Sequence, residues 1–123
     1  MDLRTRLIHS GLERTDGALV QPVFQSATYE SVQAGSYDDI RYLRLNNSPN
    51  HRDLAARLTA ITGGEAAVVA GSGMAAITTT LMTLVRSGGH ILAQDCLYGG
   101  TLSFLEEDAP AMGISVDTVD GDA

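Results

Sequence analysis

The spacing of apolar residues in the second half of the chain alternates between the period of a helix and that of a strand. A helix is expected from Asn50, a capping residue, to the glycines at 63 and 64, because apolar side chains recur there at helical spacing. The short apolar run of residues 66–70 predicts a buried strand, and Ser72 can cap a second helix that ends near Arg86. The inward face of this second helix is expected to carry Met74, Ile77, Leu81, Leu84 and Val85.

The pattern predicts two further strands with a third helix between them. Residues 90–94 and 114–119 are expected to be strands, and residues 101–111 a helix with apolar contacts from Leu102, Phe104 and Leu105. Strands that alternate with helices pair in parallel through crossover helices, so the predicted fold class is α/β. Ligands of such sheets bind at the carboxyl ends of the strands, where the two glycine-rich turns of this chain fall.

Residues 1–40 lack this periodicity and are expected to form an extended arm, with only a short β-prone piece around residues 22–24. An arm of this kind has to lie on a larger body, which is either its own domain or a partner subunit. We therefore divide the chain into an N-terminal arm and subunit-contact segment, residues 1–49, and an incomplete α/β domain, residues 50–123. A sheet of three parallel strands is thin, which indicates the first part of a larger domain.

Charge and composition exclude several classes of function. The 123 residues carry 8 Lys+Arg against 15 Asp+Glu, a net charge of -7, which argues against nucleic-acid binding. All eight basic residues are arginines, so this chain has no lysine amine for covalent chemistry. In the uncharged stretch 66–85 the glycines interrupt a helix and the threonines make it too polar to cross a membrane, so we expect no membrane partner.

The cysteine and histidine content excludes a disulfide framework and a metal site. Cys96 has no second cysteine to pair with and is expected to be a buried structural thiol. The three histidines, at scattered spacings, form no ligand pattern and are expected to be structural. The first twenty residues contain no targeting signal, so we expect a cytoplasmic protein.

The segment Gly71-Ser72-Gly73-Met74 lies between a predicted strand and a predicted helix. Such a turn directs free backbone N–H groups, the positive end of the helix dipole and the Ser72 hydroxyl at one point, which favours binding of an anion. Glycine lets a phosphate approach the backbone without a Cβ in the way. The same residues also suit an ordinary strand-to-helix turn with a serine cap.

Two further segments contain side chains that suit a phosphorylated, flat ligand. Residues 41–57 hold four arginines against one acid, and within them Arg44 and Tyr42 can donate to a phosphate. Tyr98, beside glycines after the strand 90–94, can lay its ring on a flat ligand. Taken singly, these are also typical of a solvated basic face and of a core tyrosine at a turn. Together they describe pyridoxal phosphate (PLP).

At this point the sequence resembles the Cys/Met metabolism family of PLP-dependent enzymes, the trans-sulfuration enzymes that include cystathionine γ-synthase, the cystathionine lyases and methionine γ-lyase. The resemblance spans nearly the whole chain. The segments that carry it, in order, are Thr5-Arg6-Leu7-Ile8-His9-Ser10-Gly11, Gln21-Pro22-Val23-Phe24-Gln25-Ser26-Ala27-Thr28-Tyr29, Tyr42-Leu43-Arg44, Gly64-Glu65-Ala66-Ala67, Gly71-Ser72-Gly73-Met74-Ala75-Ala76-Ile77 and Asp95-Cys96-Leu97-Tyr98-Gly99-Gly100-Thr101.

The resemblance implies roles for matching residues. Gly73 and Met74 would bind the cofactor phosphate through backbone N–H groups, and Tyr98 would stack on the pyridine ring. Tyr42 and Arg44 would reach across a dimer interface to the phosphate of the neighbouring subunit, on which the N-terminal arm would also pack. The implied fold is the start of the large domain of an aspartate aminotransferase-like, fold type I transferase. After Arg44, however, the family commonly has Gly-Asn-Pro-Thr, whereas this chain continues Leu-Asn-Asn-Ser-Pro-Asn, which leaves the loop geometry open.

The resemblance also implies that the catalytic residues lie outside this sequence. The family's Schiff-base lysine and the aspartate that pairs with the pyridinium nitrogen are expected beyond residue 123, so we assign no catalytic residue and predict that the chain alone is inactive. The expected function is the N-terminal part of a homo-oligomeric trans-sulfuration enzyme, or of one completed by a separate C-terminal part. Its reaction would be β/γ-elimination or γ-replacement on cystathionine, an O-acylhomoserine or a related amino acid. The alternatives are a stand-alone phosphate- or nucleotide-binding α/β module and a non-catalytic interaction fragment.

Overall fold

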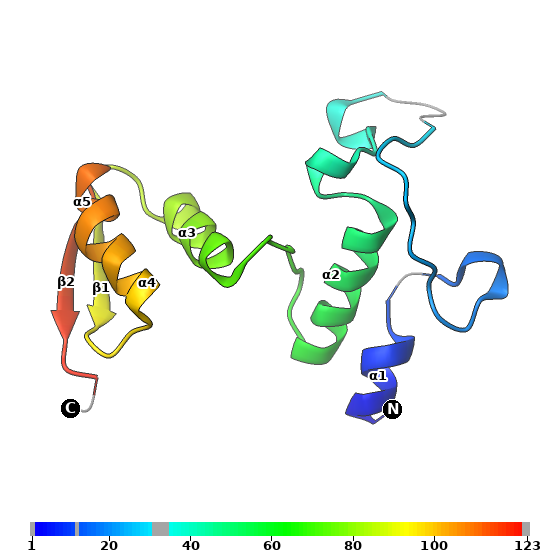
Figure 1. Cartoon of the computed structure of the whole chain (residues 1–123), viewed down its shortest axis with the longest axis horizontal. Coiled ribbons are helices and arrows are strands. Elements are labelled where there is room, and N and C mark those ends of the chain that lie inside the picture. The colour runs from blue at the N-terminus through cyan, green and yellow to red at the C-terminus, as the bar shows by residue number, and fades with distance from the viewer. Residues whose placement is uncertain (1, 12, 31–34, 122–123) are drawn as a thin grey trace. The chain divides into compact units, whose positions relative to one another are not determined.

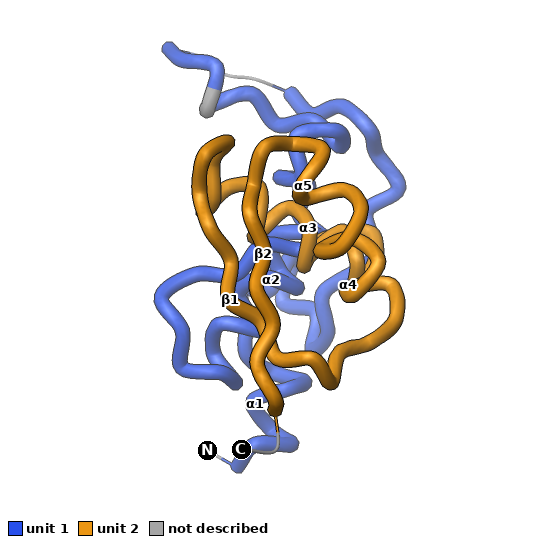
Figure 2. Tube along the Cα trace, turned by 90° about the vertical axis from the view of Figure 1, so that its left-hand side faces the viewer, with its two compact units in different colours: residues 1–69 blue, residues 70–123 orange. Residues whose placement is uncertain are grey.

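The computed structural model describes residues 2–11, 13–30 and 35–121, and Figure 1 shows its helices and strands. The chain divides into two compact units, Met1–Val69 and Ala70–Ala123, which are coloured separately in Figure 2. The predicted division after residue 49 concerns the roles of the two segments in an enzyme rather than their compactness, and it stays a prediction.

The main element of the first unit is α2 (Pro49–Thr62), preceded near the N-terminus by α1 (Leu3–His9). The predicted end of α2 is confirmed, because Gly63 adopts φ 73°, a left-handed conformation that suits glycine, and its N–H donates to the Thr59 carbonyl. The predicted capping residue is wrong. The helix is capped by the fully buried Ser48, whose hydroxyl accepts from the N–H of His51 at 3.4 Å.

Arg57 connects α1 to α2. It pairs with Asp53 at 2.7 Å, and its guanidinium also donates to the carbonyls of Leu7 and Ile8 at 3.2 and 2.7 Å. The Arg57 side chain is only 19% exposed, and the expectation that the arm is extended from its start is wrong, since α1 is helical. A polar side chain, rather than an apolar stripe, attaches this helix.

The middle of the first unit contains short helical turns but no strand among its described residues. The 3-10 turns are Thr15–Gly17, Tyr37–Asp39 and Leu43–Leu45, and an isolated antiparallel bridge joins Thr28 to Tyr42. The β-prone piece at residues 22–24 forms no strand, because its backbone is bonded to a side chain instead. The Asn50 amide accepts from the N–H of Phe24 and donates to its carbonyl, both at 2.9 Å.

The second unit is a helix followed by a strand–helix–strand segment. Its elements are α3 (Gly73–Leu84), β1 (His90–Gln94), α4 (Gly99–Ser103), a π-helical turn (Phe104–Asp108), α5 (Ala109–Ala111) and β2 (Ser115–Val119). The two strands pair in parallel, with His90 opposite Ser115 and Gln94 opposite Val119. The predicted parallel α/β arrangement of this region is confirmed, with the crossover helix starting two residues earlier than expected.

The core of the second unit consists of four buried apolar residues, Phe104, Leu105, Ala109 and Ile114. Around them pack partly buried side chains from α3 and the strands, among them Met74, Leu81, Val85, Ile91 and Val116. The predicted inward face of α3 is therefore confirmed at residues 74, 81 and 85 and wrong at the other two positions. Ile77 and Leu84 are 36% and 75% exposed, because in this structure α3 presents only one side to the crossover helix.

The strand predicted over residues 66–70 is not formed. A strand exists only where a neighbour completes its ladder of backbone hydrogen bonds, and no described strand lies beside this segment, since the sheet contains β1 and β2 alone. The carbonyl of Val69 instead accepts from the side-chain amide of Asn46 at 2.8 Å.

Among the described residues, no helix is long and apolar enough to cross a membrane.

Candidate functional site

The turn at the start of α3 has the geometry expected of an anion site. Ser72 caps the helix, its hydroxyl accepting from the N–H of Ala75 at 3.0 Å, which leaves its own hydroxyl proton free to donate. The N–H groups of Gly73 and Met74 have no acceptor among the described residues. A Cβ built on Gly71 or on Gly73 would meet nothing within 4 Å, so the turn is open. Free donors, open space and the positive end of a 12-residue helix thus coincide.

Tyr98 directly precedes α4 and lies close to Gly100, which Met74 of α3 also approaches. Its ring passes over Gly100, where a built Cβ would lie 3.0 Å from Tyr98 Cε1 and 3.3 Å from Met74 Sδ. Tyr98 is 76% exposed, so one face of the ring is available. Tyr98 and Met74, the latter in the first turn of α3, therefore both lie close to Gly100, and the expectation of a core tyrosine is not met.

Thr101 was not singled out from the sequence, yet it belongs to the same cluster. It is 8% exposed, and its hydroxyl donates to Met74 Sδ at 3.7 Å. Its backbone N–H donates to the Tyr98 carbonyl at 2.8 Å, so Thr101 contacts both the stacking residue and the first turn of α3. A threonine directly after a glycine pair carries no sequence signal for this role, because the contact depends on the packing of α4 on α3.

Tyr42 and Arg44 form a separate pair in the first unit. The Arg44 guanidinium carbon lies 4.5 Å from the centroid of the Tyr42 ring, a cation–π contact. Arg44 makes no hydrogen bond or ion pair with the described residues, so its planar donors remain available. The six residues predicted to bind the cofactor thus fall into two groups in different units: Ser72, Gly73, Met74 and Tyr98 in one, Tyr42 and Arg44 in the other.

The loop that departs from the family pattern is fixed by two asparagines. Asn47 accepts from the N–H of Tyr42 at 2.9 Å and donates to the carbonyl of Ile40 at 2.7 Å, which holds the backbone on either side of Arg41. Asn46 adopts φ 55°, a left-handed conformation that asparagine tolerates better than most residues. The sequence signal for a turn was present, because asparagine pairs are typical of turns, but the specific bonds were not predictable.

Other reactive side chains do not join either group. Cys96 is exposed, so the expectation of a buried thiol is wrong. His51 contacts Ser48 at 2.7 Å and His90 pairs with Asp117 at 2.9 Å, both consistent with structural roles. Among the described residues, no cluster of three or more His, Cys, Asp or Glu side chains could hold a metal ion.

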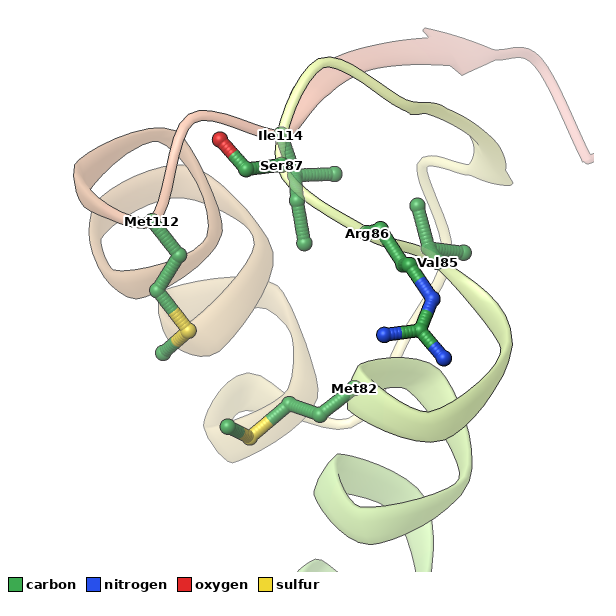
Figure 3. Close-up of a pocket in the computed structure, with 6 residues that line it drawn as sticks. All are labelled: Met82, Val85, Arg86, Ser87, Met112 and Ile114. Carbon is green, nitrogen blue, oxygen red and sulfur yellow. The ribbon is translucent and has the colours of Figure 1, made fainter.

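A pocket of about 410 Å³ lies elsewhere in the second unit and contains none of the predicted site residues. Figure 3 shows that Met82 of α3 and Met112, directly after α5, approach it from two sides. Arg86 and Ser87 complete its rim. It therefore gives no support to a cofactor site at this end of α3, and the candidate site stays at the N-terminal end of the helix.

An open, glycine-rich helix N-terminus with an exposed aromatic ring beside it, on a parallel α/β frame, is an arrangement that can accept a phosphorylated planar group. Comparison with known sequences agrees: residues 4–123 match the family described as Cys/Met metabolism PLP-dependent enzyme. The chain belongs to this family.

Individual relatives show how much of an enzyme the chain covers. It is 40% identical to an L-methionine gamma-lyase of Pseudomonas putida, over 94% of this chain and 31% of the relative. It is 36% identical to a cystathionine gamma-lyase of Bacillus subtilis, over 98% of this chain and 32% of the relative. The chain thus spans about a third of the length of these curated relatives.

Solved structures support the same fold. A crystal structure of cystathionine gamma-lyase from Lactobacillus plantarum, complexed with L-serine, matches 98% of this chain with a TM-score of 0.85 at 28% identity. That match covers 31% of the solved chain. A crystal structure of metB from Corynebacterium glutamicum matches the whole chain with a TM-score of 0.88 at 25% identity, over 32% of its own length. The α/β structure with parallel strands therefore matches structures of fold type I trans-sulfuration enzymes.

Proposed function

We propose that this chain supplies the phosphate-binding turn and the ring-stacking residue of a PLP-dependent trans-sulfuration enzyme. The observation that carries the proposal is the approach of both Tyr98 and Met74 to Gly100, beside an open turn with free N–H groups. A phosphate needs donors at one point and a pyridine ring needs a flat apolar surface a short distance away. The two requirements are met within a single compact unit.

In this proposal the backbone N–H groups of Gly73 and Met74 donate to the phosphate, and the Ser72 hydroxyl adds a third donor. Ser72 can do so while capping the helix, because a hydroxyl accepts and donates at once. No Cβ intrudes at Gly71 or Gly73, so the anion can approach the backbone closely. The residues present therefore fit the phosphate of the cofactor that gives the family its name.

Tyr98 would orient the cofactor ring. Its exposed ring can stack on a flat heterocycle, while one edge of the ring lies close to Gly100. Thr101 would act as a positioning residue, since it bonds to Met74 and to the Tyr98 backbone.

Tyr42 and Arg44 would donate to the phosphate bound by a neighbouring subunit. The cation–π contact supports this role, because it orders the guanidinium beside the phenol before any ligand binds. The N-terminal arm would pack on the same neighbour. A homo-oligomer, or a complex with a separate C-terminal part, would supply the remaining contacts.

PLP, when bound, supplies an electron sink that stabilises negative charge at the α-carbon of an amino-acid substrate. This chain contributes binding and orientation to that chemistry, and with no lysine among its 123 residues it offers no side-chain amine to link the cofactor covalently. We therefore propose that the chain alone does not catalyse the reaction. In a complete enzyme the substrates would be cystathionine, an O-acylhomoserine or a related sulfur amino acid.

The test is titration of the 123-residue chain with pyridoxal 5'-phosphate by calorimetry, with Y98A and Y98F as a matched pair. We expect binding to weaken about tenfold in Y98A and little in Y98F, because a phenylalanine ring stacks as well as a tyrosine ring. Borohydride reduction followed by peptide mapping should leave no adduct on any side chain. Equal binding by Y98A, or preference for a nucleotide such as AMP, would contradict the proposal and favour a general phosphate-binding module.

A further inference from the structure

Two arginines of the first unit line the same two hollows, and the guanidinium groups of both are unpaired among the described residues. Arg41 and Arg52 both border a hollow of about 340 Å³ and a second one of about 310 Å³. Neither guanidinium forms a hydrogen bond or an ion pair within the part of the chain that the structure describes, and it is the backbone N–H of Arg52 that donates to the Ser48 carbonyl. By contrast, Arg57 is paired with Asp53 and Arg6 donates to the Ala60 carbonyl. Two free guanidinium groups at one place favour a ligand with a carboxylate or phosphate.

The other polar side chains around these hollows are largely committed to neighbouring groups. Asn47 is bonded to the backbone at both ends of its amide, and the Asp39 carboxylate accepts from two backbone N–H groups at 3.0 and 2.9 Å. The Tyr29 hydroxyl donates to a backbone carbonyl at 3.0 Å, and the Thr15 hydroxyl donates to Gln21 at 2.9 Å. The arginines are therefore not needed to satisfy these groups, and they can turn to a ligand.

One acid faces the larger hollow. Glu13 lines it together with the two arginines, and its carboxylate makes no ion pair with them. Phe24 and Pro49 give the same hollow an apolar wall. The hollow thus presents two positive charges, one separate negative charge and an apolar surface. A plain anion would meet the Glu13 carboxylate as a like charge, whereas a molecule with an ammonium beside its carboxylate would meet an opposite charge at each end.

We propose that the larger hollow binds a free α-amino acid with an aliphatic side chain, its carboxylate on Arg41 and Arg52 and its ammonium on Glu13. The volume of about 340 Å³ lies at the lower end of the range for small-molecule sites and suits a ligand of this size. All the residues that line the hollow belong to the first unit, so the site does not depend on the phosphate turn of α3 or on the proposed cofactor.

The experiment compares three matched probes on the full chain by NMR titration. L-valine carries both charges, isovalerate lacks the ammonium and isobutylamine lacks the carboxylate. We expect L-valine to bind at least about tenfold tighter than either analogue, because each analogue leaves one charged end of the hollow without a partner. The shifted resonances should map to residues 13–52.

Variants separate the two ends of the site. R41Q and R52Q should each weaken L-valine and isovalerate by about tenfold, whereas E13Q should weaken L-valine alone. R86Q is the control, because it removes an exposed arginine of the second unit with the same change in charge. Far-UV circular dichroism checks that each variant folds.

Three results would overturn the inference. One is isovalerate or inorganic phosphate binding as tightly as L-valine with no effect of E13Q, which would make this a plain anion site. Another is a loss in R86Q equal to that in R41Q, which would mean that net charge alone attracts the probe. The third is the absence of any shift with L-valine in a folded chain.

Discussion

Replacing Ser72 separates its role in holding the helix from its proposed role at the phosphate. S72A removes the hydroxyl that accepts from the Ala75 N–H at 3.0 Å. Loss of an N-cap of this kind costs about 1 kcal/mol, within a range of about 0.5–2 kcal/mol. For a small domain, this lowers the melting temperature by about 4–8 °C.

S72D should keep the stability of the helix but weaken the binding of a phosphate. Aspartate is as good a capping residue as serine and interacts favourably with the helix dipole, so the free energy of unfolding should stay within about 0.5 kcal/mol of the parent chain. Its charge, however, repels a phosphate that carries about -1.5 to -2 at neutral pH. At about 1 kcal/mol for two unit charges 4 Å apart in water, the repulsion amounts to about 1.5–2 kcal/mol, or about tenfold to thirtyfold in affinity.

The assay combines thermal unfolding by circular dichroism with calorimetric titration of pyridoxal 5'-phosphate. S103A serves as the control, because Ser103 lies in α4 without a side-chain cap bond and should lose neither stability nor affinity. S72A is expected to be less stable, and S72D to be stable but weak in binding. Unchanged affinity in S72D would refute the placement of the phosphate at this turn, whatever the effect on stability.

Three further substitutions test the packing. Leu105 is only 2% exposed, so L105A should lower the free energy of unfolding in urea by about 2–5 kcal/mol. L84A, on the exposed side of α3, should lower it by less than about 0.5 kcal/mol. Equal losses would contradict the assigned core. R57Q should speed hydrogen exchange at the amides of Leu3–His9, because α1 loses its carbonyl contacts, while R4Q should not. G63A should cost about 1 kcal/mol from its positive φ alone, since nothing lies near a built Cβ, and G99A, also in open space, should cost less. A smaller loss in G63A than in G99A would argue against the left-handed cap.

Local signals predicted most of the second unit and the end of α2 well. Ser72 as a cap and Gly63 as a stop are side-chain and backbone preferences that act within a few residues, and both are confirmed. The strand at 90–94 follows from a short apolar run and the strand predicted at 114–119, observed at 115–119, from alternating apolar and polar residues, and their parallel pairing follows from the helix between them. The donors of the candidate site were predictable for the same reason, because they belong to a single turn at the start of α3.

Contacts that depend on distant residues were the ones that sequence patterns missed. The helical α1 is held by Arg57, some fifty residues later, and no periodicity encodes a guanidinium that donates to backbone carbonyls. Ser48 displaced Asn50 as the cap of α2 because the Asn50 amide is taken by the backbone of Phe24. Where two polar residues can both serve as a cap, the tertiary contact that removes one of them decides between them.

The faces left uncovered follow from the same principle. Ile91 and Ala93 of β1 pack on the core. On the opposite face of the sheet, Leu92 of β1 is 63% exposed and Val119 of β2 is 47% exposed. Parallel sheets are ordinarily covered on both faces, so apolar side chains on the outer face indicate a sequence shaped for packing beyond the contacts described. The apolar run at residues 66–70 forms no strand for the same reason, since a strand needs a neighbouring strand to complete its backbone hydrogen bonds. An apolar pattern reports the contacts that a sequence can make, and those contacts form only where the complementary surface is present.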